Sequence, residues 1–299
     1  MRKSLELRLA YREEIKSELA QRTAKHQAKI AAMKAARTAA VAAGAVLPAE
    51  PLVLLAHGDS WFDYPLDDHD LPTGDFDIIA QLESMGNVNP VIHNISHYGD
   101  ATTEEMSLPK QQNIIASLTT PANWMNGKPD AILFSGGGDD IAGNQFCIFL
   151  DYASAGGSGL DTGRFQDVLA MVRGSYQDLF LLRDRNAANV PIFGHCYDFP
   201  IPNGSHPLCA GPWLLPSLQF TGWTVAQGTQ ILHDALVQFR SMLIGLASNP
   251  ANNFILIDTQ DTLVASDWHN ELHPYSEGFK KLAARFVDAL RAKFGPARI

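Results

Sequence analysis

Short apolar runs recur along the chain, and each of them ends at a glycine or a polar turn. They cover residues 51–56, 91–96, 131–134, 190–193 and 254–257. A continuous apolar run of this length is typical of a strand buried in a parallel sheet. Stretches with helical composition and spacing follow the runs, at residues 76–85, 103–117, 163–187, 224–247 and 276–294. Strand and helix thus alternate five times, which predicts an α/β fold with three αβα layers and a five-stranded, mainly parallel sheet.

A single long helix is predicted before this pattern, over residues 4–42. It contains neither Gly nor Pro, and a thin apolar stripe repeats along it every four residues. The stripe consists of Leu7, Tyr11, Ile15 and Leu19. We therefore divide the chain into an N-terminal helical extension, residues 1–50, and one large domain, residues 51–299. The extension is expected to pack on the domain or on a second copy, as in a homo-oligomer, because its stripe lacks the Trp or Phe of a membrane-surface anchor.

Charge is distributed unevenly between these two parts. The whole chain has a net charge of -9, but residues 1–45 carry ten basic and four acidic residues and are therefore basic. The remaining residues hold the whole acidic excess, which argues against nucleic-acid binding by the domain. The basic extension can bind an anionic surface, or simply the acidic domain.

The chain shows no transmembrane segment and no secretory leader, so a cytoplasmic protein is the default expectation. Three cysteines, Cys147, Cys196 and Cys209, are too few for a disulfide framework, although the last two can pair in an oxidising compartment. Two His-x-x-x-His pairs occur without accompanying cysteines or a His-Glu-x-x-His motif. We therefore expect no metal and no cofactor.

Chemically useful residues gather at the ends of the predicted strands, where ligands bind in sheets of this kind. Ser60 follows the first strand through His57-Gly58-Asp59. A serine at a strand-to-helix turn exposes its hydroxyl and lies beside free backbone N–H groups. Taken alone, this serine is better explained as a helix N-cap.

Four short blocks change that interpretation. They are Gly58-Asp59-Ser60-Trp61, Ser96-His97-Tyr98-Gly99, Gly137-Gly138-Asp139-Asp140 and His273-Pro274. Each block lies at a predicted strand or helix end. In sequence and in order the blocks resemble those of the SGNH/GDSL hydrolase superfamily of serine esterases and lipases, and the resemblance covers residues 52–294. The resemblance implies a flavodoxin-like domain that hydrolyses esters, with a small-molecule ester as its partner.

The matched positions imply a role for each block. Ser60 would be the nucleophile and His273 the base that takes its proton and returns it to the leaving group. The backbone N–H groups of Ser60 and Gly99 would stabilise the oxyanion. The α/β-hydrolase elbow Gly-x-Ser-x-Gly is absent.

Two positions depart from the family pattern. Asp139 stands where the family has an Asn that donates to the oxyanion, so it can serve only if protonated, with Asn144 as a substitute donor. An alternative of equal weight is that Asp139 is structural and makes turn hydrogen bonds. Asn270 stands where an Asp usually orients the histidine; it can fix the tautomer but adds no charge. Asp267 is the second candidate for that role, and His269 is a competing base.

Aromatic residues near these blocks suggest an apolar substrate. Trp61, Tyr98, Tyr197 and Trp213 are the candidate binding residues. The loop over residues 197–222 is too long and apolar for a simple connector, which makes it a candidate wall of the site. These features favour esters with lipid-like, aromatic or polyester-type groups. The alternatives are a catalytically weak or inactive binding module on the same fold, or a carbohydrate acetylesterase whose aromatic residues stack on sugars.

Overall fold

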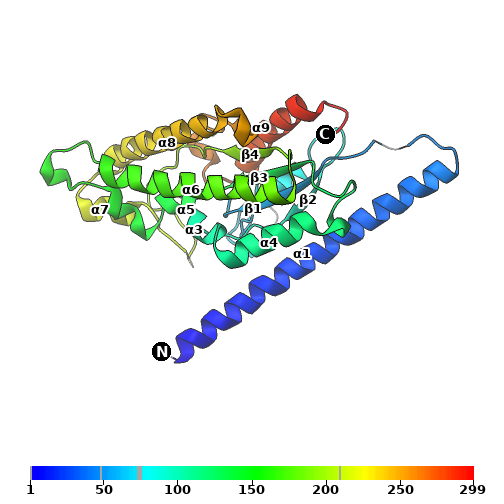
Figure 1. Ribbon diagram of the computed structural model, residues 1–299. Helices are drawn as coiled ribbons and strands as arrows, with labels where there is room; N and C mark the ends of the chain where they lie inside the picture. The colour runs from blue at the N-terminus through cyan, green and yellow to red at the C-terminus, as the bar shows by residue number, and fades with distance from the viewer. Residues whose placement is uncertain (1, 48, 73–75, 209) are drawn as a thin grey trace.

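The computed structural model describes residues 2–47, 49–72, 76–208 and 210–299 (Figure 1). Its centre is a five-stranded sheet in the order β2-β1-β3-β4-β5. The strands are β1 (Val53–Gly58), β2 (Val91–Asn94), β3 (Ala131–Ser135), β4 (Ile192–His195) and β5 (Phe254–Ile257). All four neighbouring pairs are parallel, so the predicted fold class is confirmed. Each strand overlaps one of the five apolar runs, although β1 and β4 begin two residues later than the runs at 51–56 and 190–193.

The helices form the two outer layers of the domain. They are α2 (Ile78–Leu82), α3 (Thr102–Glu105), α4 (Leu108–Thr119), α5 (Gly138–Ile141), α6 (Thr162–Asn186), α7 (Leu215–Thr221), α8 (Val225–Ala247) and α9 (Ser276–Phe294). The packing of α2 on α9 forms one layer, and α4, α6 and α8 pack side by side in the other. Single 3₁₀ turns fill several of the connections, including Pro121–Asn123 and Asn144–Phe149.

The helix expected over residues 103–117 is two helices, α3 and α4. Pro109 lies in the first turn of α4 and has no N–H to donate to the carbonyl of Glu105. That carbonyl instead accepts a hydrogen bond from Nε2 of His57, at 3.0 Å. Because of this break, the last residue of α3 is hydrogen-bonded to His57 of β1, the strand that precedes Ser60.

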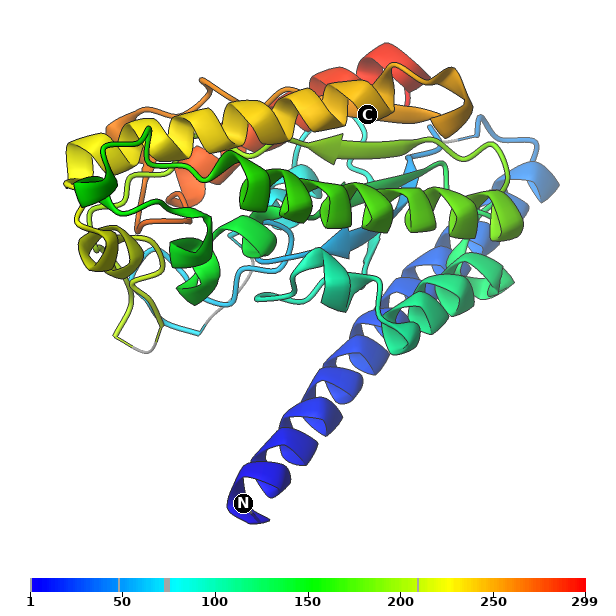
Figure 2. The ribbon, with the colours of Figure 1, turned by 60° about the vertical axis from the view of Figure 1, so that its left-hand side comes forward.

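The long N-terminal helix is α1 (Arg2–Ala42), which runs along the β2 side of the domain with its N-terminal end projecting beyond it (Figures 1 and 2). Ile30 is fully buried, whereas Tyr11 of the expected stripe is 44% exposed. Polar residues make much of the contact: Thr23 bonds to His93, and His26 bonds to the carbonyl of Asn123. Leu19 of the stripe packs against the core, whereas the side chain of Leu7 lies outside those described.

Among the described residues, no helix combines the length and the apolar character needed to span a bilayer.

The sheet order creates one crevice where the connections diverge. The chain passes from β1 to β2 on one side and later from β3 to β4 on the other, so the carboxyl ends of β1 and β3 lie next to each other at the switch. Gly58 and Ser135 are register partners at these two ends. A ligand site is expected at this point of a doubly wound sheet.

Candidate active site

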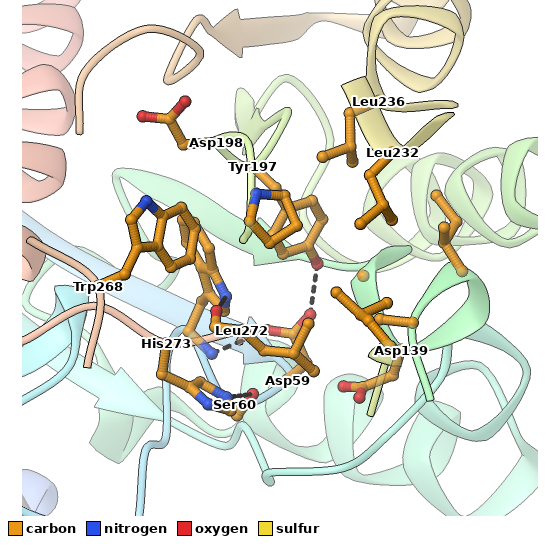
Figure 3. A pocket seen from close by; sticks show the side chains of 16 residues that line it. Asp59, Ser60, Asp139, Tyr197, Asp198, Leu232, Leu236, Trp268, Leu272 and His273 are labelled. Atoms are coloured by element: carbon orange, nitrogen blue, oxygen red, sulfur yellow. Dashed lines mark hydrogen bonds between the residues drawn. The ribbon is translucent and has the colours of Figure 1, made fainter. Parts of the chain in front are cut away.

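Ser60 lies directly after β1, on the turn at this crevice. A Cβ on Gly58 would overlap the carbonyl oxygen of Ser135, so only glycine lets the strand end so close to β3. Oγ of Ser60 lies 2.8 Å from Nε2 of His273, a residue 213 positions away. Figure 3 shows this contact at one end of a pocket. The structure thus brings together the two residues that the sequence motifs proposed as nucleophile and base.

His273 occupies the loop that leads into α9. Its ring is stacked on Tyr64 at 4.3 Å between centroids, and Trp213 meets it edge-on at 5.6 Å. Nδ1 of His273 lies 3.0 Å from Oδ1 of Asn270. Burial lowers the pKa of His273 to about 3, and His269 contributes a smaller repulsion. The imidazole is therefore neutral at physiological pH.

The hydrogen bonds around Asn270 identify the tautomer of that imidazole. Oδ1 accepts from the backbone N–H groups of Leu272 and His273, while Nδ2 donates to the hydroxyl of Tyr64 at 3.0 Å. The amide orientation is fixed by these partners, so Nδ1 of His273 must carry the hydrogen that faces Oδ1. Nε2 is left as an acceptor for the Ser60 hydroxyl. Proton transfer from Ser60 to His273 is therefore chemically available.

Asp267, the second candidate for orienting His273, has other partners. Both of its carboxylate oxygens accept from Nζ of Lys281 at 2.7 Å, and Oδ2 also accepts from the N–H of Val264. Its backbone carbonyl accepts from Tyr275 at the start of α9. Asp267 thus holds the entry to α9, and among the described residues its carboxylate makes no hydrogen bond to His273. His269, the competing base, faces Asp70 at 3.5 Å rather than Ser60.

Asp59 connects the Ser60 turn to the neighbouring strands. Oδ1 accepts from the hydroxyl of Ser135 at 2.7 Å and from the N–H of Trp61 at 2.9 Å, and Oδ2 accepts from the hydroxyl of Tyr197. Tyr197 itself has a positive φ of 56°, which aims its ring back toward β1. Burial raises the pKa of Asp59 to about 6, and the three hydrogen bonds oppose that rise. This network joins the turn that carries Ser60 to β3 and to Tyr197.

Two backbone N–H groups, on the turn after β1 and on the loop after β2, are the candidate oxyanion donors. Within the described ranges, the N–H groups of Ser60 and Gly99 have no hydrogen-bond acceptor. Gly99 has φ of 78°, a left-handed conformation that glycine adopts without strain. Unpaired N–H groups of this kind can receive a developing oxyanion.

Asp139 lies in the first turn of α5 and lines the same pocket as Ser60 (Figure 3). Burial, followed by the charges of Asp59 and Asp140, raises the pKa of Asp139 well above its usual value. A protonated carboxyl can donate a hydrogen bond, as an amide does. Asn144, the alternative donor, is exposed on the following 3₁₀ turn and does not line the pocket.

The pocket beside Ser60 has a cavity volume of about 50 Å³, and its wall is largely apolar. Apolar side chains come from α5, α8 and two long loops: Ile141, Pro200, Leu214, Leu232, Leu236, Trp268 and Leu272. Leu232 and Leu236 project into it from α8, opposite Trp268 (Figure 3).

The four candidate binding residues fall in different places. Tyr197 lines the pocket, and so does Trp61, whose Nε1 donates to the carbonyl of Leu272. Trp213 does not line the pocket but meets the ring of His273 edge-on. Tyr98 lies outside the pocket, stacked on His97 at 4.4 Å beside the cleft between α1 and the domain. The structure therefore does not bring this ring to the pocket.

The described residues include no group of three or more His, Cys, Asp or Glu side chains placed to hold a metal ion. Cys147 and Cys196 are free thiols, and Cys209 lies outside the described residues, so its suggested pairing is not addressed.

Comparisons with known proteins were made at three levels. No family model matches the chain, and no curated protein matches it. An extracellular lipase of Streptomyces rimosus does match in structure, with a TM-score of 0.50 and 14% sequence identity over 79% of this chain and 98% of that one. The chain has an SGNH/GDSL hydrolase-like fold. At this identity the likeness concerns the fold alone.

Two further similar structures have lower TM-scores. The lipase Lip_vut3 from a goat rumen metagenome is 17% identical, with a TM-score of 0.49 over 80% of this chain and 97% of that one. A member of the lipolytic protein G-D-S-L family from Veillonella parvula is 13% identical, with a TM-score of 0.45 over 79% of this chain and 96% of that one.

Sequence reasoning missed three features of the site on this SGNH/GDSL-like fold. Tyr64 supports both His273 and Asn270 from a segment read only as an acidic loop. Glu271 is fully buried and accepts four backbone N–H groups of the loop opposite. Leu232 and Leu236 were assigned only to a helix.

Proposed function

We propose that this protein is a serine hydrolase that cleaves carboxylic esters through an acyl-enzyme on Ser60. The observation that carries the proposal is the 2.8 Å contact between Oγ of Ser60 and Nε2 of His273 at the mouth of an apolar pocket. A nucleophile and a base within hydrogen-bond reach, with a third group orienting the base, is the signature of covalent catalysis. The fold shared with a lipase supports the same reaction class.

Acylation begins with attack by Oγ of Ser60 on the ester carbonyl carbon. The serine proton passes to Nε2 of His273, and the carbonyl oxygen becomes an oxyanion. The tetrahedral intermediate then collapses: the bond to the alcohol breaks, and the alcohol oxygen takes the proton from His273. The products of this half-reaction are the free alcohol and an acyl group on Ser60.

Deacylation repeats the same steps with water. His273 takes a proton from a water molecule as its oxygen attacks the acyl carbon, and the second intermediate collapses with return of the proton to Ser60. The carboxylic acid leaves, and Ser60 and His273 are restored. The neutral Nδ1–H tautomer held by Asn270 accepts the proton in each attack step, and the imidazolium formed then returns it as the intermediate collapses.

The oxyanion would be stabilised by the N–H groups of Ser60 and Gly99 and by the protonated carboxyl of Asp139. The raised pKa of Asp139 supports the neutral form of that carboxyl. A low-dielectric site with fixed donors is the most effective way to stabilise charge that appears only in the transition state. In this proposal the protonated Asp139 carboxyl donates the hydrogen bond that a side-chain amide would donate.

The acyl group would occupy the pocket that Leu232 and Leu236 line. Apolar surface gains roughly 25 cal/mol for each Å² removed from water, so a hydrocarbon or aryl acyl group is favoured over a sugar. The test is hydrolysis of p-nitrophenyl esters of increasing acyl length by wild type and Ser60→Ala. Ser107→Ala is the control, because that serine also precedes a helix but makes no side-chain cap bond. Retained turnover in Ser60→Ala would refute the proposal.

An inactive or weakly active binding module is the second candidate, and Asn270 is the observation that favours it. The neutral amide does not compensate the positive charge that His273 acquires when it accepts a proton. A fluorophosphonate probe separates the candidates, since only an activated Ser60 displaces fluoride from it. Absence of labelling on folded wild-type protein would support the binding module.

A further inference from the structure

The two backbone donors of the proposed oxyanion site belong to separate loops. Ser60 lies on the turn after β1, and Gly99 lies on the loop after β2. Both N–H groups must donate to the same oxygen atom, so the distance between the two loops decides whether they can stabilise one oxyanion together. Two contacts within the domain help to set it: Nδ2 of Asn94 donates to the carbonyl of Phe62 at 2.7 Å, and the N–H of His97 donates to the carbonyl of Gly58 at 2.9 Å.

A third connection comes from the N-terminal helix. The guanidinium of Arg22, on α1, donates from one arm to Oδ1 of Asp63 at 2.6 Å and from the other to the carbonyl of Ser96 at 3.3 Å. Asp63 lies on the same turn as Ser60, and Ser96 lies on the same loop as Gly99. One planar side chain therefore bridges the two segments that carry the donors.

The surroundings of Arg22 hold it in this position. One turn further along α1, Nε2 of His26 lies 2.7 Å from the carbonyl of Asn123, and Ile30 is fully buried. Toward the N-terminus, the hydroxyl of Tyr11 reaches Nε2 of His97 at 3.3 Å. The helix is thus fixed to the domain on both sides of Arg22.

Asp63 depends on this contact. Its side chain is only 12% exposed, and its second oxygen, Oδ2, is buried without a hydrogen-bond partner among the described residues. A buried carboxylate with one strong partner is costly to leave unpaired. The pair is therefore better placed than a surface ion pair to transmit a change in α1 to the Ser60 turn.

We infer that Arg22 is a positioning residue, which acts from α1 through Asp63 and the Ser96 carbonyl to hold the N–H groups of Ser60 and Gly99 on one oxyanion. The inference rests on the proposed ester hydrolysis and goes beyond it, because it makes the N-terminal helix part of the active-site framework. Arg22 touches neither the pocket nor the reacting atoms. Its loss should reduce transition-state stabilisation and leave substrate binding in the acyl pocket intact.

Three single variants test this with a p-nitrophenyl ester that wild type hydrolyses and Ser60→Ala does not. Arg22→Met should lower kcat by about 10-fold with KM changed less than about 2-fold, a smaller loss than deleting an oxyanion donor outright. Arg22→Lys, which keeps the charge but not the two-armed geometry, should fall in between. Arg37→Met is the matched control, because Arg37 pairs with Glu50 at 3.0 Å from the same helix, away from the Ser60 turn. Its kcat should equal that of wild type.

Active-site titration with a fluorophosphonate separates positioning from folding. Full labelling with slow turnover supports the inference, whereas partial labelling with normal turnover per labelled site overturns it. Asp63→Asn should lower kcat similarly, and the double variant with Arg22→Met should be no slower than the slower single variant. Equal kcat in Arg22→Met and Arg37→Met also overturns the inference. If wild type hydrolyses no ester at all, the proposed function fails instead.

Discussion

Oδ1 of Asn270 lies 3.0 Å from Nδ1 of His273, the position that a carboxylate occupies in a Ser-His-Asp triad. The amide holds the ring and the tautomer as a carboxylate would. It adds no negative charge, and the ring is buried against Tyr64 and Trp213. Asn270 thus supplies the geometry of the third triad residue without its negative charge. The pH dependence of the proposed reaction should show the effect of the missing charge.

The wild-type enzyme should keep its activity in acid. Burial lowers the pKa of His273 to about 3, and the neutral ring is the active form, so activity is retained as the pH falls through the ordinary histidine range. We expect kcat/KM to stay nearly constant from about pH 8 to about pH 5 and to fall only below that. Return to neutral pH after each measurement controls for unfolding. A half-loss near the ordinary histidine pKa would contradict the prediction.

Asn270→Asp should restore the missing charge. A carboxylate at 3.0 Å from Nδ1 favours the imidazolium, so the pKa of His273 rises and the acid limb of kcat/KM moves to higher pH. The Tyr64 hydroxyl can donate to the new oxygen in place of accepting from Nδ2. At neutral pH we expect kcat to rise by about 10-fold, since the developing charge is stabilised. Asn270→Ala, which removes orientation as well, should be slower than wild type; an unmoved acid limb in Asn270→Asp would refute the argument.

Asp139→Asn should leave the rate at neutral pH close to that of wild type and remove the dependence on a proton. The wild-type carboxyl donates only while protonated, so its contribution is lost as the pH rises through its raised pKa. The amide donates at every pH, and the alkaline limb of kcat should therefore disappear. Asp139→Ala should lose about 10²-fold or more at neutral pH. Equal losses in the Asn and Ala variants would exclude Asp139 as a donor.

Leu236→Phe should shift the acyl preference toward shorter chains. The larger side chain fills part of the pocket opposite Trp268, so kcat/KM for a long acyl ester should fall by about 10-fold relative to acetate. Val237→Phe is the control, because Val237 is the next residue of α8 but is 38% exposed. The same chain-length profile in both variants would place the acyl group elsewhere.

Glu271→Gln should destabilise the loop that forms the far wall of the site. The carboxylate accepts the N–H groups of Gly204, Trp213, Leu214 and Leu215 at 2.6–2.9 Å. An amide turns an NH₂ group toward two of these donors, which costs about 1–3 kcal/mol for each unsatisfied group. Thermal unfolding measures the loss, and Glu277→Gln, at a side chain that is 78% exposed, is the control. Equal midpoints for the two variants would show that the buried carboxylate is dispensable.

The sheet and the large helices could be predicted from the sequence because burial on both faces demands uninterrupted apolar runs. Phe254–Ile257 and Ser276–Phe294 lie where the pattern placed them. The division of α3 from α4 was missed, although Pro109 signals it, because the surrounding composition is helical throughout. The short α5 and α7 were missed as well, since helices of one or two turns depend on tertiary contacts more than on pattern.

The pairing of Ser60 with His273 was within reach of the sequence, because the blocks that hold them occur in a recognisable order. Their supporting residues were not. The bond between Tyr64 and Asn270 joins residues 206 positions apart, and no local pattern marks either of them. Asp267 was considered for its proximity to His273 in sequence, but the turn into α9 directs its carboxylate to Lys281. The roles assigned to Gly99 and Asp139 stay predictions.

The order of the strands along the chain has a consequence for its biosynthesis. Ser60 follows the first strand of the sheet to be translated, whereas His273 follows the last, and each of the other blocks emerges between them. A nascent chain therefore carries Ser60 long before it carries His273. Until β5 is inserted and α9 packs on α2, Ser60 lacks its contact with His273, so under the proposed mechanism incomplete or truncated chains are inactive and activity appears only when the fold is complete.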